Sequence, residues 1–428
     1  LFTIPDPPVD FVGREKELNE LLQAFEAGRR GAAITGLSGG AGVGKTALAR
    51  ALAQALAGRF PDARLEIDLQ GVPKEGQTPL SPAEALRRLL TPFYPYPGAK
   101  LPDQESELRG LFVDALRTRR ALLLLDNAKD AAQVRPLLPP APSAAIVTSR
   151  AHIVLSAEGL RPLRLEALPL GEAMSLLRQV APRLRAEADE AVARLAEACG
   201  RLPLALRCAA SLLEARPGWA LGGYLERLAD ERGQLAALRD PHDPDLDVEA
   251  ALMVSYRALD QGLQARLRAL GVFPARFAAG AAAGVWACDA DQAGEALEEL
   301  VYLGLAERQA GAYRLHDLTR AFALGRLCEK QDEARQAGER HAAYYLEVGS
   351  RANALYKQGG EHILAGLGRF REAWPHLQAA WRRMAGEEAW PRPQGAERWL
   401  CDFPDRTTYV LDLTVTARER IGYRQRAA

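Results

Sequence analysis

The sequence predicts a multi-domain protein in which an α/β domain with a parallel sheet comes first and largely helical domains follow. Residues 31–165 alternate between short apolar or period-two runs, typical of strands, and stretches with helical spacing. From Gly171 onward helical patterns replace the strand pattern, apart from one hairpin signal. The length of 428 residues agrees with this fold class, because about 100–200 residues per domain predicts several domains.

Residues 39–46 read Gly-Gly-Ala-Gly-Val-Gly-Lys-Thr and match the P-loop motif G-x-x-x-x-G-K-[ST]. An apolar run precedes them and a run with helical spacing follows. Glycines let successive amides point at one anion, and the helix N-terminus adds partial positive charge. Lys45 is expected to reach the outer phosphates, and the Thr46 hydroxyl to ligate Mg²⁺. The expected nucleotide-binding residues here are Gly40, Ala41, Gly42, Val43, Gly44, Lys45, Thr46 and Ala47.

Two further strand ends carry polar side chains. The apolar run 121–125 ends at Asp126, which we interpret as a Walker B aspartate that holds Mg²⁺ through water. A lone apolar strand ending in aspartate is common, and the interpretation depends on the P-loop beside it. The strand expected at 144–149 ends at Arg150, which either senses the terminal phosphate or is a solvated strand-end arginine.

Composition excludes several classes of partner. Lysine plus arginine equals aspartate plus glutamate at 55 each, so no overall charge draws the chain to nucleic acid or anionic membranes. The five cysteines lack C-x-x-C spacing, which indicates reduced thiols and no zinc site. The reduced thiols in turn indicate a cytoplasmic setting. No apolar run approaches the roughly 20 residues that span a bilayer. Because the chain starts at Leu1 without methionine, we expect a piece of a longer protein with neighbouring domains missing.

Helical patterns and proline-rich punctuation divide the chain into four expected domains. They are a P-loop nucleotide-binding domain with an N-terminal segment at 1–166, a helical bundle at 167–243, a winged-helix domain at 244–330 and a helical region at 331–428. The last region resembles the start of a TPR-like array, although a clean period of about 34 residues is missing. Its aromatic residues are expected to form a core.

The winged-helix assignment comes from the order of elements in the third domain. Helices are expected near 248–258, 262–271 and 290–303. Two short strands at 305–308 and 312–315 then flank a turn that contains glycine. Three helices followed by a hairpin are typical of a winged helix.

With this order laid out, the chain resembles the NB-ARC branch of the STAND class, the signal-transduction ATPases with numerous domains. The resemblance covers about residues 10–330. The matching elements are Phe11-Val12-Gly13-Arg14-Glu15 for hhGRE, the P-loop, Leu122 to Asp126 for Walker B, Thr148-Ser149-Arg150 for the sensor segment, Gly200-Arg201-Leu202-Pro203-Leu204-Ala205 for GLPLA and Leu315-His316-Asp317 for MHD.

The resemblance implies a nucleotide that touches three domains. Val12 and Arg14 would lie against the adenine, Pro203 would pack on it from the helical domain, and His316 would contact the β-phosphate of ADP. From the residues alone, His316 is an ordinary solvated or capping histidine. ADP would hold the domains closed, and exchange for ATP with Mg²⁺ would favour self-association. Protein partners would bind through missing or C-terminal repeat regions.

One departure from the family concerns hydrolysis. Many members have a second acid after the Walker B aspartate, whereas this chain has Asn127. An amide can orient water but cannot accept its proton. The sequence therefore predicts a weak, slow ATPase, with Lys45, Asp126 and Arg150 as the candidate catalytic residues.

Two other functions compete with the switch. The alternative is a DNA-binding transcriptional regulator that uses the winged helix. Its recognition helix, about 290–303, has four acidic residues and no lysine or arginine, so phosphates would repel it and nucleic acid is an unlikely partner. A metabolic P-loop kinase would need an acceptor site, and the sequence shows no compact cluster of polar residues for one.

Overall fold

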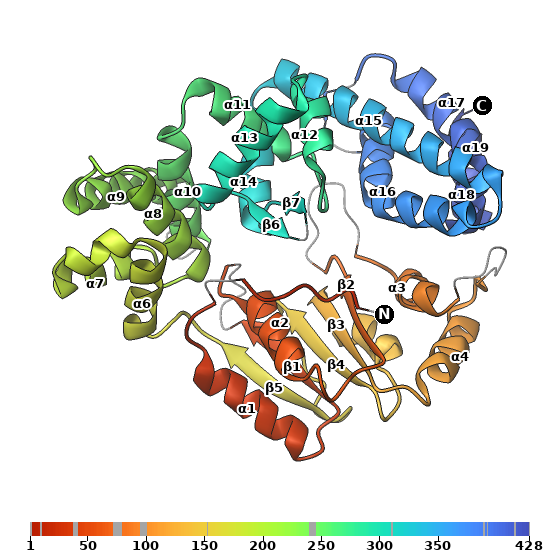
Figure 1. Ribbon diagram of the computed structural model, residues 1–428, viewed down its shortest axis with the longest axis horizontal. Helices are drawn as coiled ribbons and strands as arrows, with labels where there is room; N and C mark the ends of the chain where they lie inside the picture. The colour runs from red at the N-terminus through yellow and green to blue at the C-terminus, as the bar shows by residue number, and fades with distance from the viewer. Residues whose placement is uncertain are drawn as a thin grey trace. The chain divides into compact units, whose positions relative to one another are not determined.

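The computed structural model describes residues 2–8, 11–36, 42–71, 79–94, 101–151, 153–238, 245–309, 311–387, 390–391, 393–414 and 417–427. The described chain divides into two compact units (Figure 1). The first contains the described residues up to Ala258, and the second contains those from Leu259 onward.

A five-stranded parallel sheet forms the centre of the first unit, as the sequence predicts. The strands are β1 (Gly31–Gly36), β2 (Ala63–Asp68), β3 (Ala121–Ala128), β4 (Ala144–Ser149) and β5 (Leu160–Leu165). Their spatial order is β2-β3-β4-β1-β5. All four pairings are parallel, so the carboxyl ends of β2, β3 and β4 lie at the same edge of the sheet.

Helices cover both faces of this sheet. The helices are α1 (Glu15–Glu26), α2 (Lys45–Ala55), α3 (Pro82–Leu90), α4 (Glu105–Leu116) and α5 (Ala131–Val134), with 3₁₀ turns η1 (Thr91–Phe93) and η2 (Arg135–Leu137). Leu122 and Leu124 of β3 pack with α1 and α2, whereas Leu123 and Leu125 pack with α3 and α4. Side chains alternate along a strand, so β3 is buried on both faces, as its continuous apolar run predicts.

Helix α3 was not predicted. It begins with a capping box in which the Ser81 hydroxyl accepts from the Glu84 amide and the Glu84 carboxylate accepts from the Ser81 amide. Pro82 occupies the first turn, where its missing N–H costs no hydrogen bond. These residues were a readable start signal. The 3₁₀ turn η1 follows α3 directly at Thr91–Phe93.

Gly31 in β1, which lies between β4 and β5, has no room for a side chain. A β-carbon there would lie 2.1 Å from the Ala145 backbone oxygen of β4. We expect Gly31→Ala to lower the free energy of unfolding by about 2–3 kcal/mol, because a backbone carbonyl in a sheet cannot move aside. Urea unfolding measures this. Gly58→Ala is the control, since nothing lies within 4 Å of its β-carbon position; equal losses in both variants would contradict the prediction.

A helical segment follows the sheet within the first unit. It contains α6 (Leu170–Val180), η3 (Pro182–Ala186), α7 (Asp189–Ala198), α8 (Pro203–Ala215), α9 (Leu221–Leu238) and α10 (Leu246–Arg257). α6 packs against α7 and α8, and α10 packs against α8 and α9. α10 therefore belongs to the first unit, although the sequence analysis grouped its residues with the hairpin that follows.

The second unit begins with helices and a hairpin. They are α11 (Gln261–Leu270), α12 (Ala279–Trp286), α13 (Ala290–Tyr302), β6 (Glu307–Gln309) and β7 (Ala312–Arg314). β6 and β7 pair antiparallel, and Phe277 adds a bridge to Tyr313. α12 was not predicted, and it packs against α11, α13 and the following helix α15 (Gln331–Gln358).

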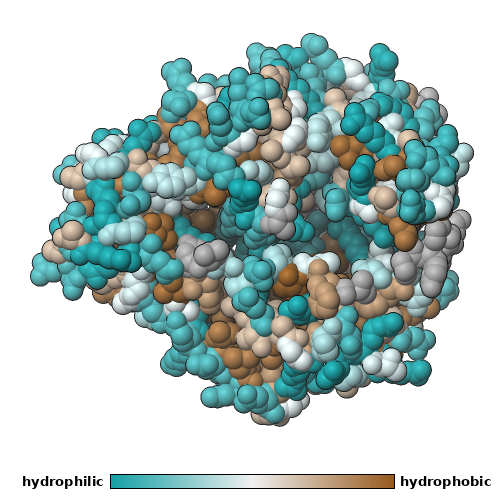
Figure 2. All heavy atoms as spheres, in the orientation of Figure 1, coloured by the Kyte–Doolittle hydropathy of each residue, from teal (hydrophilic) through white to brown (hydrophobic). Residues whose placement is uncertain are grey.

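Helices complete the second unit, as predicted. They are α14 (Asp317–Cys328), α15, α16 (His362–Met384), α17 (Ala396–Arg406), α18 (Thr408–Thr414) and α19 (Ala417–Ala427). α15 and α16 pair along their lengths, and Trp374, Trp381 and Phe403 form a buried aromatic core. Hydrophilic side chains cover much of the face shown in Figure 2. Among the described helices, none combines the length and apolar character needed to cross a membrane.

Candidate functional site

The N-terminus of α2 has the geometry of an anion site. Gly42 and Gly44 have φ angles of 85° and 96°, a left-handed conformation that favours glycine. Gly44 is the N-cap residue of α2 and, as a glycine, makes no side-chain capping bond. Ala47 lies in the first turn of α2. The predicted binding residues Gly40 and Ala41 lie outside the described residues.

Lys45 is the first residue of α2 and its ammonium group is partly desolvated. Burial and, to a lesser extent, the positive charge of Arg150 lower the pKa of Lys45 to about 8, while Asp126 and Asp245 act in the opposite direction. The structure therefore brings Lys45, Arg150 and Asp126 close enough to influence one another. A polyphosphate would supply the negative charge that this pair of cations favours.

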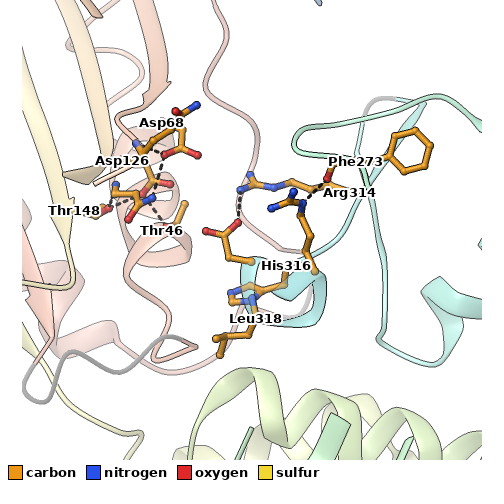
Figure 3. A network of polar contacts seen from close by, with 12 residues as sticks. Thr46, Asp68, Asp126, Thr148, Phe273, Arg314, His316 and Leu318 are labelled. Carbon is orange, nitrogen blue, oxygen red and sulfur yellow. Dashed lines mark hydrogen bonds and ion pairs between the residues drawn. The ribbon is translucent and has the colours of Figure 1, made fainter. Parts of the chain in front are cut away.

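Asp126 lies near the carboxyl end of β3 and is 6% exposed. The Thr46 hydroxyl donates to Asp126 Oδ1 at 2.8 Å, and the Thr148 hydroxyl of β4 donates to the same oxygen (Figure 3). Burial raises the pKa of Asp126, and Glu66 raises it further, whereas the two hydroxyl bonds lower it. The predicted metal-binding residues Thr46 and Asp126 are thus brought together.

The Thr46 hydroxyl and the Asp126 carboxylate are suitable ligands for Mg²⁺. The ion prefers hard oxygen ligands and keeps several waters, so one hydroxyl and one carboxylate beside substrate phosphates are a sufficient protein contribution. A divalent cation would also compensate the burial of the Asp126 carboxylate, which here relies on hydroxyl donors. Thr46 and Asp126 therefore fit the ion that the P-loop implies.

Asp68, at the end of β2, is a residue of this site that the sequence analysis missed. β2 pairs with β3 so that Asp68 is in register with Asp126. Asp68 Oδ1 accepts from the Asn127 side-chain amide at 3.2 Å and from the Gln70 backbone amide at 2.8 Å. Period-two alternation predicted the strand, but only the pairing of β2 with β3 places this carboxylate at the site.

Arg14 is buried, at 4% exposure, and hydrogen-bonds to the surrounding loops. Its guanidinium donates to the backbone oxygens of Val43 and Glu166 and pairs with Glu17 at 2.8 Å. Its backbone amide donates to Glu172 Oε2 of α6 at 3.2 Å. Arg14 therefore connects the glycine loop, whose described residues are 42–44, to α6 at the start of the helical segment. The expected adenine contacts of Val12 and Arg14 remain predictions.

Two residues of the helical segment lie at the same end of α2. A β-carbon at Gly44 would lie 3.7 Å from Pro203 Cγ, so the first residue of α8 borders the glycine loop. Asp245, which precedes α10, is close enough to raise the pKa of Lys45. Pro203 was a predicted site residue and lies beside the N-terminus of α2; its packing on adenine remains a prediction.

His316, in the second unit, caps α14. Its Nδ1 accepts from the Leu318 amide at 3.2 Å, which leaves the ring proton on Nε2. Its neighbour Asp317 pairs with Arg314 at 3.8 Å (Figure 3). This capping geometry holds the ring in place. Contact between His316 and a nucleotide stays a prediction.

Sequence comparison finds relatives among regulatory proteins. No protein-family model matches the chain. The regulatory protein AfsR of Streptomyces coelicolor is 36% identical over 382 residues, 85% of this chain and 37% of AfsR. AfsR of Streptomyces griseus is 36% identical over 371 residues, 84% of this chain and 37% of that protein. The disease resistance protein RPV1 of Vitis rotundifolia is 25% identical over 267 residues, 60% of this chain and 18% of RPV1. The chain spans little more than a third of the AfsR relatives' length.

The fold is also found in a solved structure. A crystal structure of a STAND protein with a tetratricopeptide repeat sensor, from Pyrococcus horikoshii, covers 99% of this chain with a TM-score of 0.54. The match covers 58% of that chain at 17% identity. At this identity the likeness shows a shared fold: a parallel α/β domain followed by helical domains.

Proposed function

Because the chain belongs to the STAND class of P-loop NTPases, we propose that it is a regulatory ATPase that works as a nucleotide-operated switch. ADP holds the domains in a closed arrangement. Exchange for ATP with Mg²⁺ releases this arrangement and favours self-association. Hydrolysis is slow and returns the protein to the ADP state.

The observation that carries this proposal is the position of Pro203 and Asp245 at the N-terminal end of α2, beside Gly44 and Lys45. Both residues belong to the helical segment, whereas Lys45 and Thr46 belong to the α/β domain. A nucleotide bound here would contact both the α/β domain and the helical segment, or interact electrostatically with both. A ligand shifts a conformational equilibrium by its differential affinity for the two states, so a phosphate that interacts with both parts favours one arrangement over another.

The proposed roles follow the chemistry of each side chain. Lys45 contacts the outer phosphates, Thr46 and Asp126 hold Mg²⁺, and Arg150 contacts the terminal phosphate of ATP. Val12, Arg14 and Pro203 surround the base, and His316 contacts the β-phosphate of ADP. We also propose the four-domain division at 166/167, 243/244 and 330/331, with protein partners binding through missing or C-terminal repeat regions.

The test is mass determination combined with analysis of bound nucleotide. The purified chain is denatured by heat so that any bound nucleotide is released. The supernatant is then analysed for ADP and ATP. Its mass in solution is then measured with ADP and with a non-hydrolysable ATP analogue. We expect copurified ADP, a monomer in ADP and a larger assembly in the analogue. A chain isolated empty, with no affinity for either nucleotide, would contradict the proposal.

The winged-helix alternative is tested by a gel shift. α13, the would-be recognition helix, exposes only acidic charged side chains, and Glu298 pairs with Arg308 of β6 at 2.9 Å. DNA binding requires several cationic contacts. We therefore expect no salt-dependent shift of DNA by this chain, and such a shift would favour the DNA-binding function.

A further inference from the structure

We propose that Asp68 is a positioning residue for ATP hydrolysis: through Asn127 it orients the water that attacks the γ-phosphorus. The inference rests on the proposed function and deepens it. It concerns the step for which the sequence offered no acid after Asp126. The structure supplies a carboxylate from the neighbouring strand instead.

Asp68 points to the side of the sheet that holds the P-loop helix. Alternation along β2 sends Leu65 and Ile67 toward α3 and α4 and sends Glu66 and Asp68 to the opposite face. Arg50 of α2 confirms this direction, because its guanidinium contacts both carboxylate oxygens of Glu66, at 2.7 and 3.3 Å. Asp68, Asp126, Thr46 and Thr148 accordingly lie together (Figure 3).

The hydrogen bond to Asp68 determines which way the Asn127 amide faces. An ionised carboxylate only accepts, so the Asn127 nitrogen must face Asp68. The amide oxygen is then turned away from Asp68 and can accept from water. Asp68 itself is anchored, because the same Oδ1 accepts from the Gln70 backbone amide. The hydrogen bond from Asn127 to Asp68 thus fixes the orientation of the Asn127 amide oxygen, which is the acceptor for water.

The backbone of Asn127 is also constrained. Its φ of 55° is left-handed, a conformation that asparagine tolerates better than most residues. The backbone N–H of Asn127 donates to the Thr148 hydroxyl at 3.0 Å, and the backbone carbonyl oxygen of Asn127 accepts from the Gly71 backbone N–H at 2.6 Å. A β-carbon at Gly71 would lie 2.2 Å from the Lys129 nitrogen, so this approach needs glycine. Such a backbone, held from both sides, is typical of functional sites.

The chemistry requires orientation more than a strong base. The water oxygen bonds to the γ-phosphorus while the bond to the β,γ-bridging oxygen breaks, and that oxygen leaves with the electron pair on ADP. Asn127 accepts a hydrogen bond from the water and takes no proton. The proton passes to an oxygen of the phosphate that forms. In a loose transition state the nucleophile needs little deprotonation, so alignment is the main contribution.

The experiment compares Asp68→Ala, Asp68→Asn, Asn127→Ala and the double variant Asp68→Ala/Asn127→Ala in the full chain. Asp114→Ala is the matched control, because Asp114 is an exposed aspartate on α4. Three quantities are measured: the Kd for ADP and for the non-hydrolysable ATP analogue, kcat and KM for phosphate release, and the ratio of ATP to ADP in copurified nucleotide.

We expect Asp68→Ala and Asn127→Ala each to lower kcat by about 10- to 100-fold with Kd and KM within about 3-fold of wild type. Both should copurify with more ATP. Asp68→Asn keeps an acceptor oxygen and should retain hydrolysis within about 3-fold. The double variant should hydrolyse no more slowly than Asn127→Ala alone, because both substitutions remove one function.

Other outcomes overturn the inference. They are wild-type hydrolysis by Asp68→Ala, effects that multiply in the double variant, a loss of nucleotide affinity as large as the loss of kcat, or an Asp68→Asn variant as slow as Asp68→Ala. Nucleotide binding by wild type with no measurable turnover also overturns it and leaves the proposed switch standing. A wild-type chain that binds no nucleotide contradicts the proposed function itself.

Discussion

Lys45→Ala is expected to weaken binding of ADP and ATP by about 10- to 100-fold. The ammonium group lies at the N-terminus of α2 beside Asp126 and Arg150, where burial has already removed part of its hydration. A hydrogen bond to a charged group contributes about 1.5–3 kcal/mol, which corresponds to this change in affinity. Calorimetric titration with each nucleotide measures the Kd, and copurified nucleotide should fall in parallel.

Lys16→Ala is the matched control for this prediction. Lys16 is an exposed lysine on α1, so its removal changes net charge equally without touching the site. Thermal unfolding without nucleotide should show that both variants fold. If Lys45→Ala bound ADP as tightly as Lys16→Ala, the glycine loop would have to bind phosphate without its lysine, and the P-loop assignment would be wrong.

The sequence was informative wherever a signal is contiguous. The parallel sheet was predicted, because the strands within residues 31–165 are short apolar or alternating runs. The P-loop was readable for the same reason. Helix α12 was missed because Ala279–Trp286 is alanine- and glycine-rich and buried over much of its surface, which leaves no apolar stripe of period 3.6. Helix α3 was missed although Ser81 and Glu84 form a capping box and Pro82 is compatible with the first turn of a helix.

The missing parts of the site depend on pairing between distant segments. Asp68 reaches Asn127 only because β2 lies next to β3, and no local pattern fixes strand order. Likewise, Arg14 was assigned a role by resemblance, whereas its bonds to Val43 and Glu166 require the folded loops. Motifs therefore predicted the phosphate and metal chemistry, and tertiary structure was needed to find Asp68 and the contacts of Arg14.

Acid is expected to destabilise the second unit through two buried histidines. Burial lowers the pKa of His376 to about 3, with Arg320 and Arg383 contributing, although its bond to the Arg276 oxygen acts in the opposite direction. Burial lowers the pKa of His341 well below its usual value, with Arg383, His376 and Arg320 contributing. Both rings are therefore neutral in the folded state.

The sign follows from proton binding. The unfolded histidine titrates near pH 6.5, so the unfolded state takes up a proton as pH falls while folded His376 does not. Stability is fully present above pH 6.5 and falls as the pH drops below it, by on the order of 3 kcal/mol at pH 4.5 for His376 alone. His341 acts in the same direction. Urea unfolding between pH 4.5 and 7.5 measures the slope.

His376→Gln separates this effect from the titration of carboxylates. Histidine Nε2 lies 3.0 Å from the Arg276 oxygen, so it donates there, and Nδ1 then accepts from His341 at 3.4 Å. Glutamine keeps a donor for Arg276 but cannot titrate, so the pH dependence should decrease by about one proton between pH 4.5 and 6. His362→Gln is the control, because His362 is exposed on the same helix. If His376→Gln and wild type had the same slope, His376 would have to be protonated in the folded protein, which its burial between two arginines opposes.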